Sequence, residues 1–442
     1  MKPRSTLFVV SLALAVASTG GPVSGSSVAS SAKVGASVWS GFGQGPRVRV
    51  IVALREPRTP VQALAERMAE VEALQLGVLD RLAAADFRLT HRWDAISAVA
   101  GDVTPRGLDV LAEDPDVLRI DLDEPVFAAT GESVSLMRAD EVQNQGVSGR
   151  GVVVAVLDSG VERSHPDLAS SIVDEHCFCT GCCPGGSSEA AGAGSAADDN
   201  GHGTNVTGII TADGRVAPRG IAPDADIVAI KVLDRTGAGT STSIISGFDY
   251  VLKSRPEVKV VNLSLGSATL FNGTCDSSAS FATSLAQAIN ALKARGTSTF
   301  ASTLNNGSPN GIGVPACIAN AVAVGAVYDA NGGTVSFGCT DATSRRDEVP
   351  CFSNSSSKVE VLAPGAPITS AGVGGSASTF LGTSQASPHA AAAAALMLSA
   401  NPGLSPDAIK NALRATGRPI TDAKNGIAIP RIDVKAALDS VR

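Results

Sequence analysis

The chain has 442 residues, of which 44% are apolar and 17% are charged, and its net charge is −7. This composition supplies a buried core and excludes an intrinsically disordered chain. The negative charge excludes nucleic acid and an anionic membrane surface as main partners, because both require a basic face. Aromatic residues make up only 4%, so aliphatic side chains must fill the core of close-packed layers.

The N-terminus has the pattern of an export signal. A short positively charged start precedes an apolar run over residues 7–17. This run is too short for a membrane-spanning helix, which takes about 20 residues, and it ends in the small-residue cleavage pattern Ala15-Val16-Ala17. Residues 1–17 are therefore predicted to be the signal peptide of a secreted protein, with a buried N-terminal helix as the alternative. The Ser-, Gly- and Ala-rich residues 18–46 are predicted to be a flexible lead-in.

Residues 47–129 are predicted to form a small α+β unit. Hydrophobic periodicity places helices over residues 61–85 and 104–113, the second with Thr104 as its cap. The predicted strands cover residues 48–54, 87–93, 95–103 and 117–126. The resulting order β-α-β-β-α-β is that of the ferredoxin-like motif, which by itself implies no function.

From residue 130 to residue 442, short apolar strands alternate with helices, which predicts an α/β domain with a parallel sheet covered by helices. The expected strands are 152–157, 227–232, 258–263, 297–301 and 321–327, and the expected helices include 243–253, 280–295 and 387–399. Ligand chemistry on such sheets lies at the carboxyl ends of the strands. The sequence has no G-x-G-x-x-G or Walker pattern that would indicate a nucleotide.

Three segments of the second unit carry candidate catalytic residues. Asp158 ends the first predicted strand, His202 lies between two glycines, and Ser384 opens a long Ala-rich helix. Each has an ordinary alternative when taken alone, since Asp forms turns and Ser or His caps helices. Glycines beside His202 are expected to leave room for the backbone of a substrate.

Taken together and in this order, the motifs D-S-G (158–160), H-G-T (202–204) and G-T-S-x-A-x-P (382–388) resemble those of subtilisin-like serine proteases, the subtilases. The resemblance covers residues 130–442, and the upstream unit is similar to the inhibitory pro-domain of that family. It implies a secreted, monomeric endopeptidase that acts on polypeptides, is made as a self-processed zymogen and is inhibited by its own pro-domain. No cofactor is needed for such chemistry.

The resemblance also assigns roles. Ser384 would be the nucleophile, His202 its general base, and Asp158 the group that orients the imidazole before an acyl-enzyme forms. The oxyanion would bind the Ser384 N–H and an Asn side chain. The stretch 300–307 offers Asn305, with Asn306 as the runner-up and a turn role for either as the alternative. Leu304 stands where the family usually has Gly, which predicts a pocket for small or medium side chains.

Other residues follow from the same resemblance. Two segments of small residues would pair with an extended peptide unless they only form turns: Gly237, Ala238, Gly239, Ser264, Leu265 and Gly266. Asp167 matches a calcium ligand of many subtilases, but its partner ligands are not evident, so structural calcium is left open. Gln385 replaces the usual Met after the nucleophile. Asn205 replaces a common His, with no predicted catalytic consequence.

The cysteines and tryptophans are divided by the predicted cut, which should fall near residues 127–134. All eight cysteines lie after it, and both tryptophans, Trp39 and Trp93, lie before it. Exported cysteines favour disulfides, with Cys339–Cys351 and Cys275–Cys317 as suggested pairs. The block 177–183 could instead hold zinc. Two other functions stay open from the sequence, namely an inactive subtilase that only binds peptides and an exported metal-binding protein.

Overall fold

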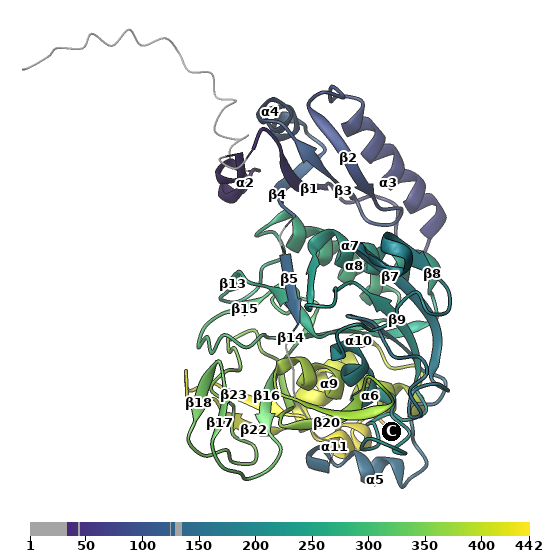
Figure 1. Cartoon of the computed structure of the whole chain (residues 1–442), viewed down its shortest axis with the longest axis vertical. Helices are drawn as coiled ribbons and strands as arrows, with labels where there is room; N and C mark the ends of the chain where they lie inside the picture. Colours follow the sequence, from purple (N-terminus) through teal and green to yellow (C-terminus); the bar gives the residue numbers. More distant parts are fainter. Residues whose placement is uncertain (1–32, 43–44, 124, 129–134) are drawn as a thin grey trace, which may run out of the picture.

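The computed structural model describes residues 33–42, 45–123, 125–128 and 135–442 (Figure 1). The predicted signal peptide and residues 129–134 lie outside them. The end of the predicted lead-in forms a short helix, α2 (Ala36–Gly41), and Val34 and Val38 are buried against the small unit that follows. Within the described residues, no helix is both long and apolar enough to cross a membrane.

The small unit has the predicted order of elements. Its sheet has the strand order β2-β3-β1-β4 with all three pairings antiparallel, and two helices cover it. Its elements are β1 (Val48–Leu54), α3 (Leu64–Leu79), β2 (Phe87–Arg92), β3 (Ala98–Val103), α4 (Pro105–Glu113) and β4 (Val117–Leu122). Thr104 caps α4 as expected, because its side chain accepts a hydrogen bond from the Gly107 N–H at 3.1 Å.

The last predicted strand of this unit is in fact two strands in different sheets. β4 ends at Leu122, and β5 (Pro125–Ala128) runs on into the larger unit, where it pairs with other strands (Figure 1). The Asp123 side chain between them accepts hydrogen bonds from the backbone N–H of Thr242, at 3.0 Å, and from its hydroxyl. The chain therefore leaves the small sheet at a residue that is bound to the large unit.

The large unit is built on a ten-stranded, mainly parallel sheet, which confirms the predicted α/β fold. The strand order is β22-β23-β19-β16-β14-β11-β6-β9-β7-β8, with antiparallel pairing only at the two outer pairs. The strands are β6 (Val153–Asp158), β7 (Ile172–Cys183), β8 (Ser187–Ala191), β9 (Asp226–Lys231), β11 (Val258–Leu263), β14 (Ser298–Ser302), β16 (Val322–Tyr328), β19 (Val361–Ala366), β22 (Arg418–Thr421) and β23 (Ala428–Arg431).

Helices cover both faces of this sheet. Successive side chains of a strand point to opposite faces, and in β6 Val154 and Val156 enter one core while Ala155 and Leu157 enter the other. The first core packs under α6 and α9, and the second under α7 and α8. The helices are α5 (Ala139–Gln143), α6 (His202–Thr211), α7 (Ser241–Ser254), α8 (Ser280–Ala294), α9 (Thr383–Ala400), α10 (Pro406–Thr416) and α11 (Val434–Asp439).

Short strands complete the large unit. They are β10 (Ala238–Thr240), β12 (Leu265–Ser267), β13 (Leu270–Phe271), β15 (Ile312–Gly313), β17 (Val335–Phe337), β18 (Cys339–Asp341), β20 (Ile368–Gly372) and β21 (Ser376–Phe380). Six of them form three two-stranded sheets, β13-β15, β17-β18 and β20-β21. The other two flank β5 in the sheet β10-β5-β12, in which β5 is the central strand. This small sheet joins the two units of the chain.

All eight cysteines form disulfides. Both suggested pairs, Cys275–Cys317 and Cys339–Cys351, are present. The cysteine-rich block forms two further bridges within the β7 region, Cys177–Cys183 and Cys179–Cys182, and no cysteine is free. A zinc site at this block is therefore wrong, because all four of its sulfur atoms are used in disulfide bonds.

Candidate active site

Asp158 and His202 are brought together by the packing of α6 against the loop that follows β6. Asp158 is the last residue of β6, and His202 is the first residue of α6. A Cβ atom at Gly203 would lie 2.1 Å from the Gly160 carbonyl oxygen. Glycine at 203 is thus required by the approach of helix and loop backbones, whereas the sequence had suggested room for a substrate.

The Asp158 carboxylate is placed to orient the His202 ring. Its Oδ1 lies 2.6 Å from His202 Nδ1 and also accepts from the Ser159 N–H at 2.7 Å. Both side chains are only 1% exposed. A buried hydrogen bond between these atoms fixes the ring plane and favours the tautomer with its proton on Nδ1, so Nε2 is the ring nitrogen that can accept a proton.

Ser384 lies in the first turn of α9 and is bonded to Ser264 in both directions. Pro388 lies one turn further along the helix and has no N–H with which to bond the Ser384 carbonyl. The Ser264 hydroxyl donates to that carbonyl at 2.6 Å, and the Ser384 hydroxyl donates to the Ser264 carbonyl at 2.8 Å. One predicted substrate-binding residue therefore holds the predicted nucleophile.

The two candidate oxyanion residues differ in how their amides are used. Asn305 Oδ1 accepts from the Thr383 N–H at 2.8 Å and from its hydroxyl at 3.1 Å, while the buried Nδ2 has no partner among the described residues. Asn306 exchanges hydrogen bonds with Asn354 at 2.9 and 3.1 Å. The geometry therefore favours Asn305, whose unpaired N–H group lies beside the residue that precedes Ser384.

The predicted substrate-binding segments flank β5. In the register, Ala238 and Gly239 of β10 lie opposite Phe127 and Val126. On the other side, Leu265 and Gly266 of β12 lie opposite Ala128 and Phe127. Gly237 does not pair with β5. Its N–H bonds to the Asp234 carbonyl at 2.9 Å, so it has the turn role that was left as the alternative. Thr240 and Ser267 also pair with β5, opposite Pro125 and Val126, and the sequence analysis did not predict either of them.

A family model described as the subtilase family matches residues 149–430. The chain belongs to the subtilase family. It is a subtilisin-like serine endopeptidase, and its reaction is the hydrolysis of peptide bonds. It is 32% identical over 360 residues to "Alkaline protease" of Alkalihalobacillus alcalophilus, which covers 80% of this chain and 83% of the relative. It is 35% identical over 294 residues to "Subtilisin DY" of Bacillus licheniformis, which covers 66% of this chain and 92% of the relative. It is also 35% identical over 284 residues to "Subtilisin Savinase" of Lederbergia lenta, which covers 64% of this chain and 89% of the relative.

Leu304 of this subtilase is buried against two glycines. The residue has φ of +73°, a left-handed conformation that favours glycine, and it is only 8% exposed. Its methyl groups occupy the space beside two glycines, since a Cβ at Gly266 or Gly313 would lie 3.1 or 2.6 Å from them. Leu304 thus packs behind the strand that pairs with β5 and directly before Asn305.

The predicted calcium ligand of the subtilase, Asp167, accepts hydrogen bonds with both of its carboxylate oxygens. The Asp167 carboxylate accepts backbone hydrogen bonds of 2.6–3.2 Å from Arg215, Val216 and Ala217. Calcium requires several oxygen ligands, and no group of three or more His, Cys, Asp or Glu side chains within the described residues could hold a metal ion. Asp167 therefore serves as an acceptor for backbone N–H groups, and structural calcium stays a prediction.

One supporting residue of the subtilase site was missed by the sequence analysis. Asp198 accepts hydrogen bonds from Ser159, Asn200, Gly201 and Thr204, at 2.6–3.0 Å, and so ties the Asp158 loop to the start of α6. Burial alone would raise the pKa of Asp198, but these hydrogen bonds outweigh it and lower the pKa. The only signal was its place in an Asp-Asp-Asn-Gly turn.

Proposed function

We propose that this subtilase is exported as a zymogen, in which residues 47–129 are a pro-domain that blocks the cleft of the peptidase domain at residues 130–442. The observation that carries the proposal is the position of β5, which lies between β10 and β12 as an extended peptide substrate would. Export is supported by the signal pattern of residues 1–17 and by four disulfides, which belong to oxidising compartments.

In the proposed chemistry, His202 removes the proton of Ser384 as the hydroxyl attacks the scissile carbonyl. Asp158 stabilises the imidazolium that forms, and His202 then passes the proton to the leaving amine. The negative charge on the tetrahedral oxygen is stabilised by the Ser384 N–H and by Asn305 Nδ2. Water then hydrolyses the acyl-enzyme. These groups supply the nucleophile, the base and the donors, so the steps require no cofactor.

The register of β5 supports a cut at the predicted domain boundary. Ala128 lies opposite Leu265, and the next residue of the cleft strand is Ser264, whose carbonyl accepts the Ser384 hydroxyl. The last described residue of β5 is therefore paired one position away from the residue that holds Ser384. We therefore propose cleavage between Ala129 and Thr130, which both lie outside the described residues.

The proposed inhibition is supported by how the small unit docks on the large one. Trp93 is fully buried and its Nε1 donates to Ser246 of α7 at 3.0 Å. Asp249, one turn further along α7, accepts from the Asp94 and Ala95 N–H groups at 3.1 and 2.6 Å. Burial at this contact raises the pKa of Asp249 to about 7. These bonds and the shared apolar core hold the pro-domain over α7 and α8.

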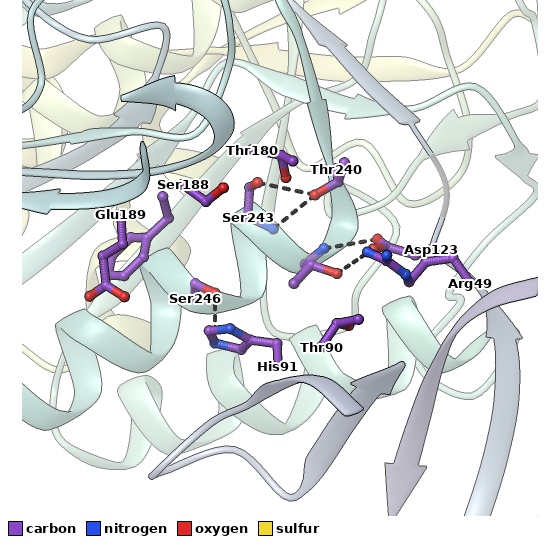
Figure 2. Close-up of a pocket in the computed structure, with 12 residues that line it drawn as sticks. Arg49, Thr90, His91, Asp123, Thr180, Ser188, Glu189, Thr240, Ser243 and Ser246 are labelled. Carbon is purple, nitrogen blue, oxygen red and sulfur yellow. Dashed lines mark hydrogen bonds between the residues drawn. The ribbon is translucent and has the colours of Figure 1, made fainter. Parts of the chain in front are cut away.

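A second group of contacts lies where β5 enters the cleft. Asp121 accepts from the Ser280 N–H at 2.6 Å at the start of α8, and Asp123 accepts from Thr242 at the start of α7. Carboxylates are favourable at helix N-termini. Figure 2 shows the cavity at this junction, about 280 Å³ in volume, where Arg49, His91 and Asp123 face the first turns of α7. The segment that occupies the cleft is therefore anchored on both sides.

A fluorophosphonate probe tests the proposed catalytic role of Ser384. The processed protein is expected to react in a 1:1 ratio, with the label on Ser384 in a peptide map, because the probe phosphonylates a serine only when a base activates it. Heat-denatured protein is the control and should remain unlabelled. A native, processed protein that takes up no label would instead support the subtilase that only binds peptides.

Specificity provides a further prediction. Leu304→Gly is expected to raise kcat/KM for a substrate with Phe before the scissile bond, relative to Ala at that position, by at least about tenfold. The reason is that removal of the side chain opens the space beside Gly266 and Gly313, and one or more methylenes in such a pocket change selectivity by 10–200-fold. Leu304→Ala is the matched control, and its ratio of kcat/KM for Phe over Ala should lie between those of the wild type and Leu304→Gly. A wild-type preference for Phe or Tyr, or an unchanged ratio in Leu304→Gly, would contradict the prediction.

A further inference from the structure

Asn205 and Gln385, the two departures from the usual subtilase motifs near the catalytic residues, are in contact with each other. Gln385 Nε2 donates to Asn205 Oδ1 at 3.1 Å. Asn205 lies one turn after His202 on α6, and Gln385 directly follows Ser384 on α9. A single side-chain bond therefore connects the helix that carries the base with the helix that carries the nucleophile.

The bond belongs to a buried polar cluster. Asn205 and Gln385 are both completely buried. Asn205 Nδ2 donates in the opposite direction, to the Ser378 carbonyl at 3.0 Å and to its hydroxyl at 3.1 Å. Ser378 belongs to β21, the strand that leads into the Gly382-Thr383-Ser384 turn. Asn205 thus holds both the residue after the nucleophile and the strand before it.

We propose that Asn205 and Gln385 are positioning residues that set the distance between His202 and Ser384. The usual family residues at these positions, His and Met, could not form this bond, because a Met side chain has no hydrogen to donate. A change at either position alone leaves a buried amide group without a partner, which is costly. The two departures are therefore a matched pair, and Asn205 has a catalytic consequence that the sequence analysis did not predict.

The pair is expected to act on kcat and to leave KM unchanged. Neither side chain belongs to β10 or β12, the strands that pair with the extended segment in the cleft. An error of 1 Å in the position of reacting groups can reduce the rate by about 10²-fold. This inference rests on the proposed roles of His202 and Ser384, so its test must separate the two.

The test is a double-mutant cycle with Asn205→Ala, Gln385→Met and the double variant. Each single variant is expected to lower kcat about tenfold at unchanged KM. The double variant should lose at least fivefold less than the product of the single losses, because the shared bond can be lost only once. Thr211→Val is the matched control, since Thr211 is a buried residue at the far end of α6 that donates to the Ala225 carbonyl at 2.8 Å. It should lower the unfolding temperature without a change in kcat.

The rate of fluorophosphonate labelling at Ser384 is measured on the same proteins, after their processed mass and circular dichroism are checked. Labelling that slows in step with kcat supports the positioning role. Losses that multiply in the double variant, or losses confined to the unfolding temperature as in Thr211→Val, would overturn it. An unlabelled wild-type protein would instead contradict the proposed function itself, so the two failures are distinguishable.

Discussion

Ser384→Ala is expected to lower kcat/KM for a peptide substrate by about 10⁵-fold or more and to leave the purified chain uncut. Without the hydroxyl no acyl-enzyme forms, and only binding and oxyanion stabilisation remain to act on attack by water. The fold should persist, because the main loss is the single hydrogen bond to the Ser264 carbonyl. Peptide turnover, intact mass and N-terminal sequencing are measured on the wild type and the variant.

Tryptophan fluorescence reports the same outcome. Trp39 and Trp93 both precede the proposed cut, and no tryptophan follows it. The processed wild type should therefore show no tryptophan emission, while Ser384→Ala retains it together with its pro-domain. Ser387→Ala is the matched control, because Ser387 is also buried in α9 and its hydroxyl donates to Asn262 Oδ1 at 2.8 Å rather than to Ser264. It should be cut and active. A Ser384→Ala chain cut at the same bond would show that another protease performs the processing.

The fold was predictable from the sequence where the pattern is periodic and local. The strand 152–157 and the helix 280–295 lie within one residue of β6 and α8, because continuous apolar runs and helical spacing directly reflect burial on the sheet. The division between β4 and β5 was not predictable. It depends on the contact of Asp123 with Thr242, which lies 119 residues away in the sequence.

The candidate site was also predictable only in part from the sequence. The motifs identified Asp158, His202 and Ser384, but not what holds them. The contact of Gly203 with Gly160 and the exchange between Ser264 and Ser384 arise only when α6, β11 and α9 have packed together. The proposed role of Gln385 could not be predicted for the same reason, because its partner Asn205 lies 180 residues earlier in the sequence. Residue types at short spacing can be read from a sequence, whereas bonds between distant elements require the fold.

Asn305→Ala is expected to lower kcat by about 10²–10³-fold, the range for loss of one oxyanion donor in a serine protease, with little change in KM. The Nδ2 group has no partner among the described residues, so the N–H is available when the tetrahedral oxygen forms. A donor that binds the transition state but not the substrate changes kcat and leaves KM unchanged.

The choice between the two asparagines makes this prediction decisive. Asn306→Ala removes the hydrogen bond from Asn354 Nδ2 to Asn306 Oδ1 and keeps the one donated by the Asn306 backbone N–H. It is expected to change kcat less than about threefold, with a lower unfolding temperature. Asn305→Ala also removes the acceptor of the Thr383 hydroxyl and N–H. Thr383→Val keeps the N–H bond to Asn305 and so measures how much of the loss comes from the hydroxyl bond. If the loss of kcat comes from the missing Asn305 Nδ2 donor, Thr383→Val should stay far more active than Asn305→Ala. A larger kcat loss in Asn306→Ala than in Asn305→Ala would move the oxyanion role to the neighbouring residue.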